Sequence, residues 1–103
     1  MSKPVAVVAL LRIRPGRDPE FNAFESRAYE VAARYGGKLE RRVAFTDGSD
    51  WSEAHVWSFP DLASFQGYRA DPDLAALAAL RAEAISDTTV MVGQLEGAFE
   101  DRH

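Results

Sequence analysis

Residues 5–13, VAVVALLRI, form the stretch that most constrains how this chain can fold. They lie between Pro4 and Pro15-Gly16 and are rich in β-branched residues, which predicts a strand. Side chains along a strand alternate between two faces, and here both faces are apolar as far as Leu11. An antiparallel strand of this kind is buried on both sides. Both faces of this strand must therefore be covered in the folded protein.

A long helix is predicted directly after this strand. Asp18-Pro19-Glu20 is a typical helix start, with Asp18 as the capping residue, and Gly36-Gly37 is typical of a helix end. The apolar residues between them recur at spacings of three and four, which predicts one buried stripe. The members of this stripe are Phe21, Phe24, Ala28, Val31 and Tyr35.

Two further strands are predicted at residues 39–45 and 52–59. The turn sequence Asp47-Gly48-Ser49-Asp50 separates them, so we expect them to pair as a hairpin. The second of these strands stops at Pro60-Asp61.

The remaining residues predict helical pieces and a last strand. A short helix carries Leu62, Phe65 and Tyr68, and a second piece starts at Asp71-Pro72-Asp73. The last strand is expected at residues 88–95, and the polar tail, residues 96–103, is expected to be flexible.

The order βαββαβ predicts an α+β protein with the ferredoxin-like plan, a four-stranded antiparallel sheet with its helices on one face. A length of 103 residues predicts a single domain, residues 1–103. The helices leave the other face of the sheet open, and an apolar face of that size marks a partner surface. The simplest cover is a second copy of the sheet, which predicts a homodimer that forms an α/β barrel.

Composition excludes several classes of function. The net charge is −4 and the basic residues form no dense cluster, so nucleic acid is not an expected partner. The absence of cysteine excludes disulfides and a thiol nucleophile. No segment has membrane-spanning length, so we expect no membrane partner and a cytoplasmic location. We expect neither a metal nor a cofactor, because only two histidines are present and no Gly-rich phosphate loop occurs.

Several segments resemble the dimeric α/β-barrel superfamily. The opening LLRIRPGRDPEFNAFE, residues 10–25, is similar to the start of its members, and further segments are similar to the branch grouped as domain of unknown function 1330. These segments are RYGGKLERR, the DW before the third strand, SFPDLASFQGYRADPDLAAL and VMVGQLEG. The resemblance implies the ferredoxin-like fold and dimerisation. The superfamily includes cofactor-free oxygenases, haem-degrading enzymes and lactone isomerases.

A haem role is disfavoured by two departures from the haem-degrading members. Tyr68 stands where they carry a histidine, and residues 5–11 are aliphatic where they carry a polar amide.

The stretch DWSEAHVWSF holds the most conspicuous side chains. Strand alternation places His55 and Trp57 on the same face as Phe59, which we expect to pack under the helices. Trp57 is then a core aromatic, with contact to a ligand as the alternative. His55 is either a hydrogen-bonded core histidine or a general base.

Three other residues are candidates for ligand binding. Arg12 is expected on the face that the partner covers, where it either pairs with a carboxylate of the other subunit or binds an acidic ligand. Trp51, at the hairpin end, either closes a cavity or packs at the dimer edge. Tyr68 either lines a pocket, with a possible catalytic role, or packs among the helices.

Three functions follow from these residues. The favoured one is the binding of a small aromatic or acidic molecule in a cavity between or beside the sheets. The second is a cofactor-independent monooxygenase or isomerase, in which Tyr68, His55 or Arg12 handles protons or an oxyanion. The third is a non-catalytic dimeric scaffold whose interior is filled with side chains.

Overall fold

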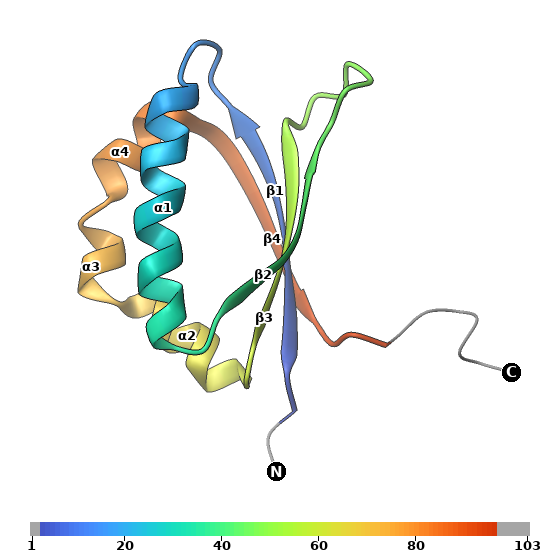
Figure 1. Cartoon of the computed structure of the whole chain (residues 1–103), viewed down its shortest axis with the longest axis vertical. Coiled ribbons are helices and arrows are strands. Elements are labelled where there is room, and N and C mark those ends of the chain that lie inside the picture. Colours follow the sequence, from blue (N-terminus) through green and yellow to red (C-terminus); the bar gives the residue numbers. More distant parts are fainter. Residues whose placement is uncertain (1–2, 97–103) are drawn as a thin grey trace, which may run out of the picture.

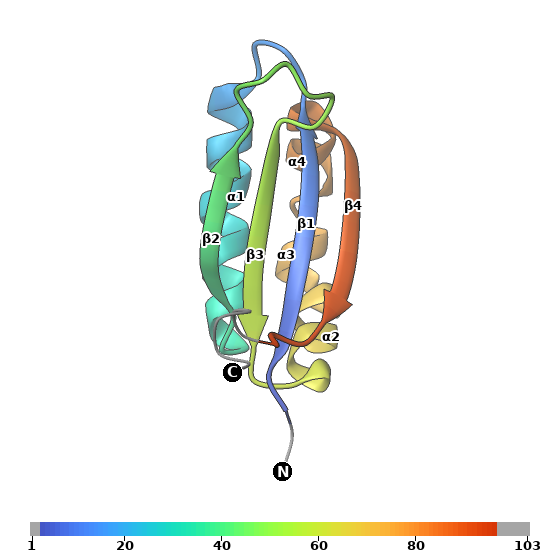
Figure 2. The ribbon, with the colours of Figure 1, turned by 90° about the vertical axis from the view of Figure 1, so that its right-hand side faces the viewer.

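The computed structural model describes residues 3–96 and has the predicted ferredoxin-like fold (Figure 1). Strands and helices follow in the order β1 (Val5–Ile13), α1 (Asp18–Arg34), β2 (Lys38–Ala44), β3 (Glu53–Phe59), α2 (Leu62–Ala70), α3 (Pro72–Ala75), α4 (Ala78–Ala84) and β4 (Ile85–Gly93). The four strands form one antiparallel sheet in the order β2-β3-β1-β4. All helices lie on one face of this sheet, and the other face is open (Figures 1 and 2).

The helix α1 begins where the sequence predicts, with Pro19 in its first turn. The capping position falls on Arg17 and not on Asp18, and no side chain caps the helix there. Four members of the predicted stripe are buried against the sheet, namely Phe21, Phe24, Ala28 and Val31. The chain leaves the helix through Gly36, whose φ of 73° is a left-handed conformation that favours glycine.

The last strand differs from the prediction because β4 begins at Ile85, three residues before Thr88. No loop separates it from α4, which ends at Ala84. Ile85 is buried and pairs with Ile13, so the chain enters the sheet as soon as the helix ends. The prediction for the tail falls almost wholly on residues 97–103, which lie outside the described part of the chain.

The second strand contains a β-bulge that the sequence pattern did not indicate. Its pairing with β3 shifts between Leu39 and Arg41, so Leu39 lies opposite Trp57 and Arg42 lies opposite His55. A bulge inserts one extra residue and thereby reverses which face the following side chains occupy. Arg42, and not Arg41, is therefore on the helix side of the sheet.

The core between sheet and helices consists of two clusters. The first gathers around the start of α1, with Leu11, Phe21, Phe24 and Ile85 among its members. The second gathers around the end of α1 and the start of α2; its buried members are Val7, Ala32, Trp57, Phe59 and Phe65. Trp57 is thus a core aromatic, as the strand alternation predicted.

The open face is apolar along its centre. Strand register places Val8 between Val56 and Met91, and Leu10 between Ala54 and Thr89. Val43 continues the second row on β2. Both Val43 and Met91 are about half exposed, at 49% each. The strand with two apolar faces therefore has one face under the helices and one face uncovered in the single chain.

Candidate functional site

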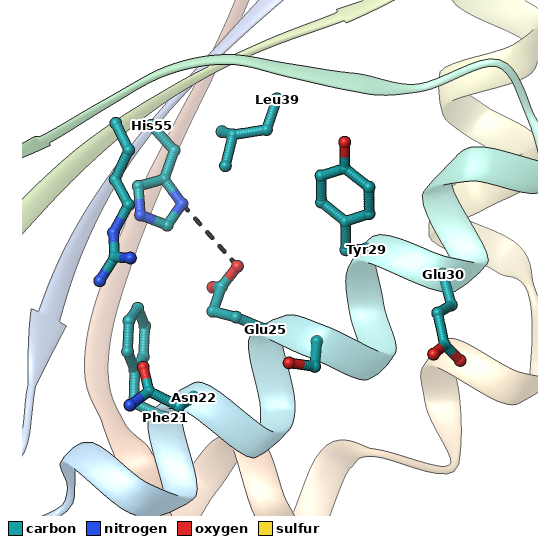
Figure 3. A pocket seen from close by; sticks show the side chains of 9 residues that line it. Phe21, Asn22, Glu25, Tyr29, Glu30, Leu39 and His55 are labelled. Carbon is teal, nitrogen blue, oxygen red and sulfur yellow. Dashed lines mark ion pairs between the residues drawn. The ribbon is translucent and has the colours of Figure 1, made fainter.

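Two pockets lie between the sheet and the helices, and most residues that line the first, beneath α1, are polar or charged (Figure 3). It has a volume of about 390 Å³. We call it the polar pocket; it is lined by Phe21, Asn22, Glu25, Ser26, Tyr29, Glu30, Leu39, Arg42 and His55. Several of the α1 residues are exposed, so the pocket opens to solvent. Glu25 and His55 point toward each other across it, whereas Glu30 points away (Figure 3).

A chain of charged contacts runs along the wall of the polar pocket. Arg42 donates two hydrogen bonds to Glu53, with Nε 2.7 Å from Oε1 and an Nη2–Oε2 distance of 2.8 Å. His55 Nε2 lies 2.8 Å from the same Oε1. On the other side of the ring, His55 Nδ1 lies 3.9 Å from Glu25 Oε2, an ion-pair distance. The His55 side chain is 2% exposed, so this chain of contacts is almost wholly shielded from water at its centre.

The two carboxyl groups have opposite electrostatic environments. Burial by itself would raise the pKa of Glu53, but the hydrogen bonds from Arg42 and His55 outweigh it, and the pKa of Glu53 is lowered. Burial raises the pKa of Glu25. No hydrogen bond from the described residues offsets this rise, and the charge of His55 lowers the pKa only in part. Glu53 is therefore an ionised acceptor, and Glu25 is the carboxyl group that takes up a proton more readily.

Glu25, Glu53 and Arg42 were not singled out from the sequence, although signals for two of them were present. Strand alternation already placed Glu53 beside His55 on the helix face, and a buried carboxylate needs a cation. Glu25 lies one turn after Phe21, at the edge of the apolar stripe. Arg42 carried no such signal, because only the bulge turns it toward Glu53.

The second pocket, which we call the apolar cavity, lies beneath α2 and α4 and has a volume of about 290 Å³. Its lining residues are Val7, Ala9, Leu11, Phe24, Trp57, Phe59, Phe65, Tyr68, Arg69, Leu74, Arg81, Ile85, Thr88 and Val90. Only two of these are charged, and both are arginines. Arg69 and Arg81 are exposed, so the positive charge lies where the cavity meets solvent.

Aromatic rings form one end of the apolar cavity. The ring of Phe59 lies 5.2 Å from that of Phe65 and 5.5 Å from that of Tyr68. Burial raises the pKa of Tyr68 to about 12. Its hydroxyl therefore stays protonated near neutral pH and acts as a hydrogen-bond donor.

The cationic side chains of this cavity are held by neighbours. The Arg69 guanidinium lies 5.5 Å from the centre of the Phe65 ring, and Arg81 Nη2 donates a 2.6 Å hydrogen bond to Thr88 Oγ1. Neither contact neutralises the positive charge.

Arg12 and Trp51 lie apart from both pockets, at one end of the sheet. Arg12 is on the open-face side, as predicted, but its carboxylate partner belongs to the same chain: Nη1 lies 2.7 Å from Asp87 Oδ2. The guanidinium also lies 4.7 Å from the centre of the Trp51 ring and donates to the Asp50 carbonyl oxygen. The structure thus brings Arg12 and Trp51 together, and separately Trp57 and Tyr68. It places His55 with acidic residues that the sequence did not single out.

The described residues hold no cluster of three or more metal-ligating side chains in an arrangement that could bind a metal ion. None of the helices within residues 3–96 has the length and apolar character to cross a membrane.

Comparison with known proteins identifies the fold. No protein-family model matches the sequence, so the resemblance to the branch of unknown function 1330 is not confirmed, and no curated protein matches it. Among solved structures, RPA0582 from Rhodopseudomonas palustris, a protein of unknown function, has 18% sequence identity and a TM-score of 0.81 over 95% of this chain and 86% of its own.

Two other solved proteins show the same arrangement. SnoaB from Streptomyces nogalater, a cofactor-independent oxygenase, has 16% identity and a TM-score of 0.73, covering 95% of this chain and 98% of its own. A dimeric ferredoxin-like protein of unknown function from Bacteroides fragilis has 16% identity and a TM-score of 0.68, covering 89% and 96%. The chain thus has the same ferredoxin-like fold as these solved proteins. Identities this low establish the fold alone, because this architecture carries many unrelated activities.

Proposed function

We propose that this protein binds a small aromatic carboxylate in the apolar cavity. The observation that carries the proposal is the charge distribution of the cavity wall, in which aromatic and aliphatic side chains are accompanied by two arginines and no acidic residue. Apolar walls with a few placed polar groups are typical of small-molecule sites. Arginine matches the planar geometry of a carboxylate with paired hydrogen bonds.

The volume supports a ligand of one or two rings. At about 290 Å³ the cavity is at the lower end of the range for small-molecule sites, which begins at about 300 Å³. The ring system would pack against Trp57 and Phe59, and the Tyr68 hydroxyl would donate a hydrogen bond to it. The carboxylate would face Arg69 and Arg81 at the solvent end.

Isothermal titration calorimetry with 1-naphthoate tests this proposal, with uncharged 1-naphthamide as the paired probe. We expect 1-naphthoate to bind the wild-type protein and the Arg69→Gln/Arg81→Gln variant to bind it about tenfold or more weakly, because a hydrogen bond to a charged group is lost. Binding of the amide should change little. Arg27→Gln, which removes an exposed charge from α1 outside both pockets, should match the wild type. Equal affinities of the wild type and the double variant for 1-naphthoate would contradict the proposal.

We further propose that two copies pair through the open face of the sheet. Its rows of Val8, Val56 and Met91 and of Leu10 and Ala54 form a continuous apolar surface that a second copy would bury. The solved proteins of the same fold support this, since the Bacteroides fragilis protein is itself described as dimeric. The partner would not complete either pocket, because both lie on the helix side.

Sedimentation velocity distinguishes the dimer from the single chain of 11.4 kDa. Val56→Glu places a charge in the middle of the open face, and we expect it to sediment as a monomer while the wild type sediments at twice the chain mass. Leu62→Glu, at an exposed apolar position of α2 away from the sheet, should remain dimeric. A monomeric wild type at micromolar concentration would overturn the pairing.

A further inference from the structure

Glu25 and His55 face each other at the wall of the polar pocket, with Nδ1 of His55 3.9 Å from Oε2 of Glu25. Glu53 is ionised and paired with Arg42, so those two charges cancel. An ionised carboxylate only accepts hydrogen bonds, and His55 Nε2 must therefore carry a hydrogen and donate it to Glu53. The other ring nitrogen of His55, Nδ1, faces Glu25.

A proton on Glu25 removes a negative charge from a largely buried position, where an uncompensated charge would be costly. Glu25 also lines the open pocket, so a bound molecule can reach its carboxyl group. The carboxyl group of Glu25 can therefore accept a proton from a bound molecule and return it.

Hydrogen-bond donors occupy the same side of α1 as Glu25. Asn22, Ser26 and Tyr29 lie three or four residues from Glu25 or from each other, which places them along one helical face. Within residues 3–96, no side-chain hydrogen bond engages their polar groups. A ligand oxygen in the pocket would therefore find donors next to the carboxyl group.

We propose that the polar pocket is a second functional site, at which Glu25 acts as a general base and acid on a small enolisable ketone or aldehyde. Glu25 removes a proton from the carbon next to the carbonyl group. The electron pair of that C–H bond forms a C=C bond, and the carbonyl π electrons move to the oxygen, giving an enolate that Asn22, Ser26 or Tyr29 stabilises by hydrogen bonds. The proton then returns to carbon or oxygen. No oxidant or reductant is consumed, and the net reaction is proton exchange or isomerisation.

The other charged groups have positioning roles. The His55 side chain is 2% exposed, so it does not act on the substrate directly, and its charge favours the ionised form of Glu25. Glu53 and Arg42 fix its ring orientation from β3 and β2. Arg81 of α4 acts on Glu25 from farther away and favours its ionised form. Burial raises the pKa of Glu25 toward neutral pH, which suits a general base. Proton transfer at Glu25 does not require carboxylate binding in the apolar cavity, although Arg81 also lines that cavity.

Exchange of deuterium from D₂O into cyclopentanone and phenylacetone, followed by ¹H NMR, tests the chemistry. We expect the wild-type protein to accelerate exchange for at least one ketone and Glu25→Gln to reduce the protein-dependent rate about 100-fold or more. Glu25→Asp should restore part of the rate. Glu83→Gln, which removes an exposed carboxylate of α4 outside the pocket, should exchange at the wild-type rate. Equal rates for wild type and Glu25→Gln with both ketones would overturn the proposal.

A ¹³C NMR titration of the Glu25 carboxyl group tests its environment without any substrate. Its midpoint should lie above that of an ordinary glutamate, because burial raises the pKa of Glu25. In His55→Gln the midpoint should rise further, because the charge of His55 favours the ionised carboxylate. A wild-type midpoint at or below that of an ordinary glutamate would overturn the assignment of Glu25 as the general base.

Discussion

The polar pocket lies beneath α1 and the apolar cavity beneath α2 and α4; they share strand β3, yet they are held together differently. In the polar pocket, His55 is fixed by charges from β2, β3 and α1. In the apolar cavity, Trp57 and Phe59 are fixed by contacts between rings. His55 and Trp57 are two positions apart on one strand. The contribution of the polar pocket to the free energy of unfolding should therefore depend on pH, whereas the contribution of the apolar cavity should not.

The largest expected effect is on the apolar side. Phe59 is 2% exposed and contacts the rings of Trp57, Phe65 and Tyr68. Phe59→Ala should lower the free energy of unfolding by about 3–5 kcal/mol, because it removes buried surface and leaves a void.

Urea denaturation at equal protein concentrations measures this loss, and it should be the same at pH 5 and pH 8. Leu62→Ala, at an exposed position, should change the free energy of unfolding by less than about 0.5 kcal/mol. A loss of unfolding free energy in Phe59→Ala that grows with pH would show that the apolar cavity is not independent of the charged groups of the polar pocket.

A smaller effect is expected from Arg42→Gln on the polar side. The folded state lowers the pKa of Glu53, so Glu53 contributes stability above the 4.5 of an ordinary glutamate, and this contribution is lost as pH falls through its folded pKa. Removal of Arg42 should cost about 1–2 kcal/mol at pH 7, near the low end for a charged hydrogen bond because Arg42 is 50% exposed.

The difference between Arg42→Gln and the wild type should shrink as the pH falls through the folded pKa of Glu53, because the carboxyl group is then protonated in both proteins. Thermal unfolding across this pH range measures it, with Arg27→Gln as the matched loss of an exposed arginine. A difference that stays constant with pH would show that Arg42 stabilises through packing and not through Glu53.

The smallest effect is expected from Glu25→Gln. The pKa of Glu25 is raised in the folded state, so its ionisation costs stability as pH rises through the folded pKa. The variant should match the wild type at pH 4 and be more stable at pH 8, by about 1 kcal/mol or less. A residue kept at such a cost is typical of functional sites. A less stable variant at pH 8 would instead identify Glu25 as a structural partner of His55.

The alternation of β3 was enough to predict which of its side chains face the helices. It placed His55, Trp57 and Phe59 on the helix face, and all three are buried there. It did not predict that these neighbours would belong to different pockets, because α1 and α2 contribute the opposing walls. Arg12 illustrates the same limit: its face was predicted correctly, but its partner Asp87 lies on β4, whose start the sequence placed three residues too late.

The sequence by itself determined the order of strands and helices and the two apolar faces of β1, because these depend on periodicity within single segments. The tertiary structure decided which side chains meet. The bulge between Leu39 and Arg41 turns Arg42 toward Glu53, and the packing of α1 on the sheet brings Glu25 to His55. Register shifts and helix placement arise from contacts between distant segments, and no pattern within one segment records them.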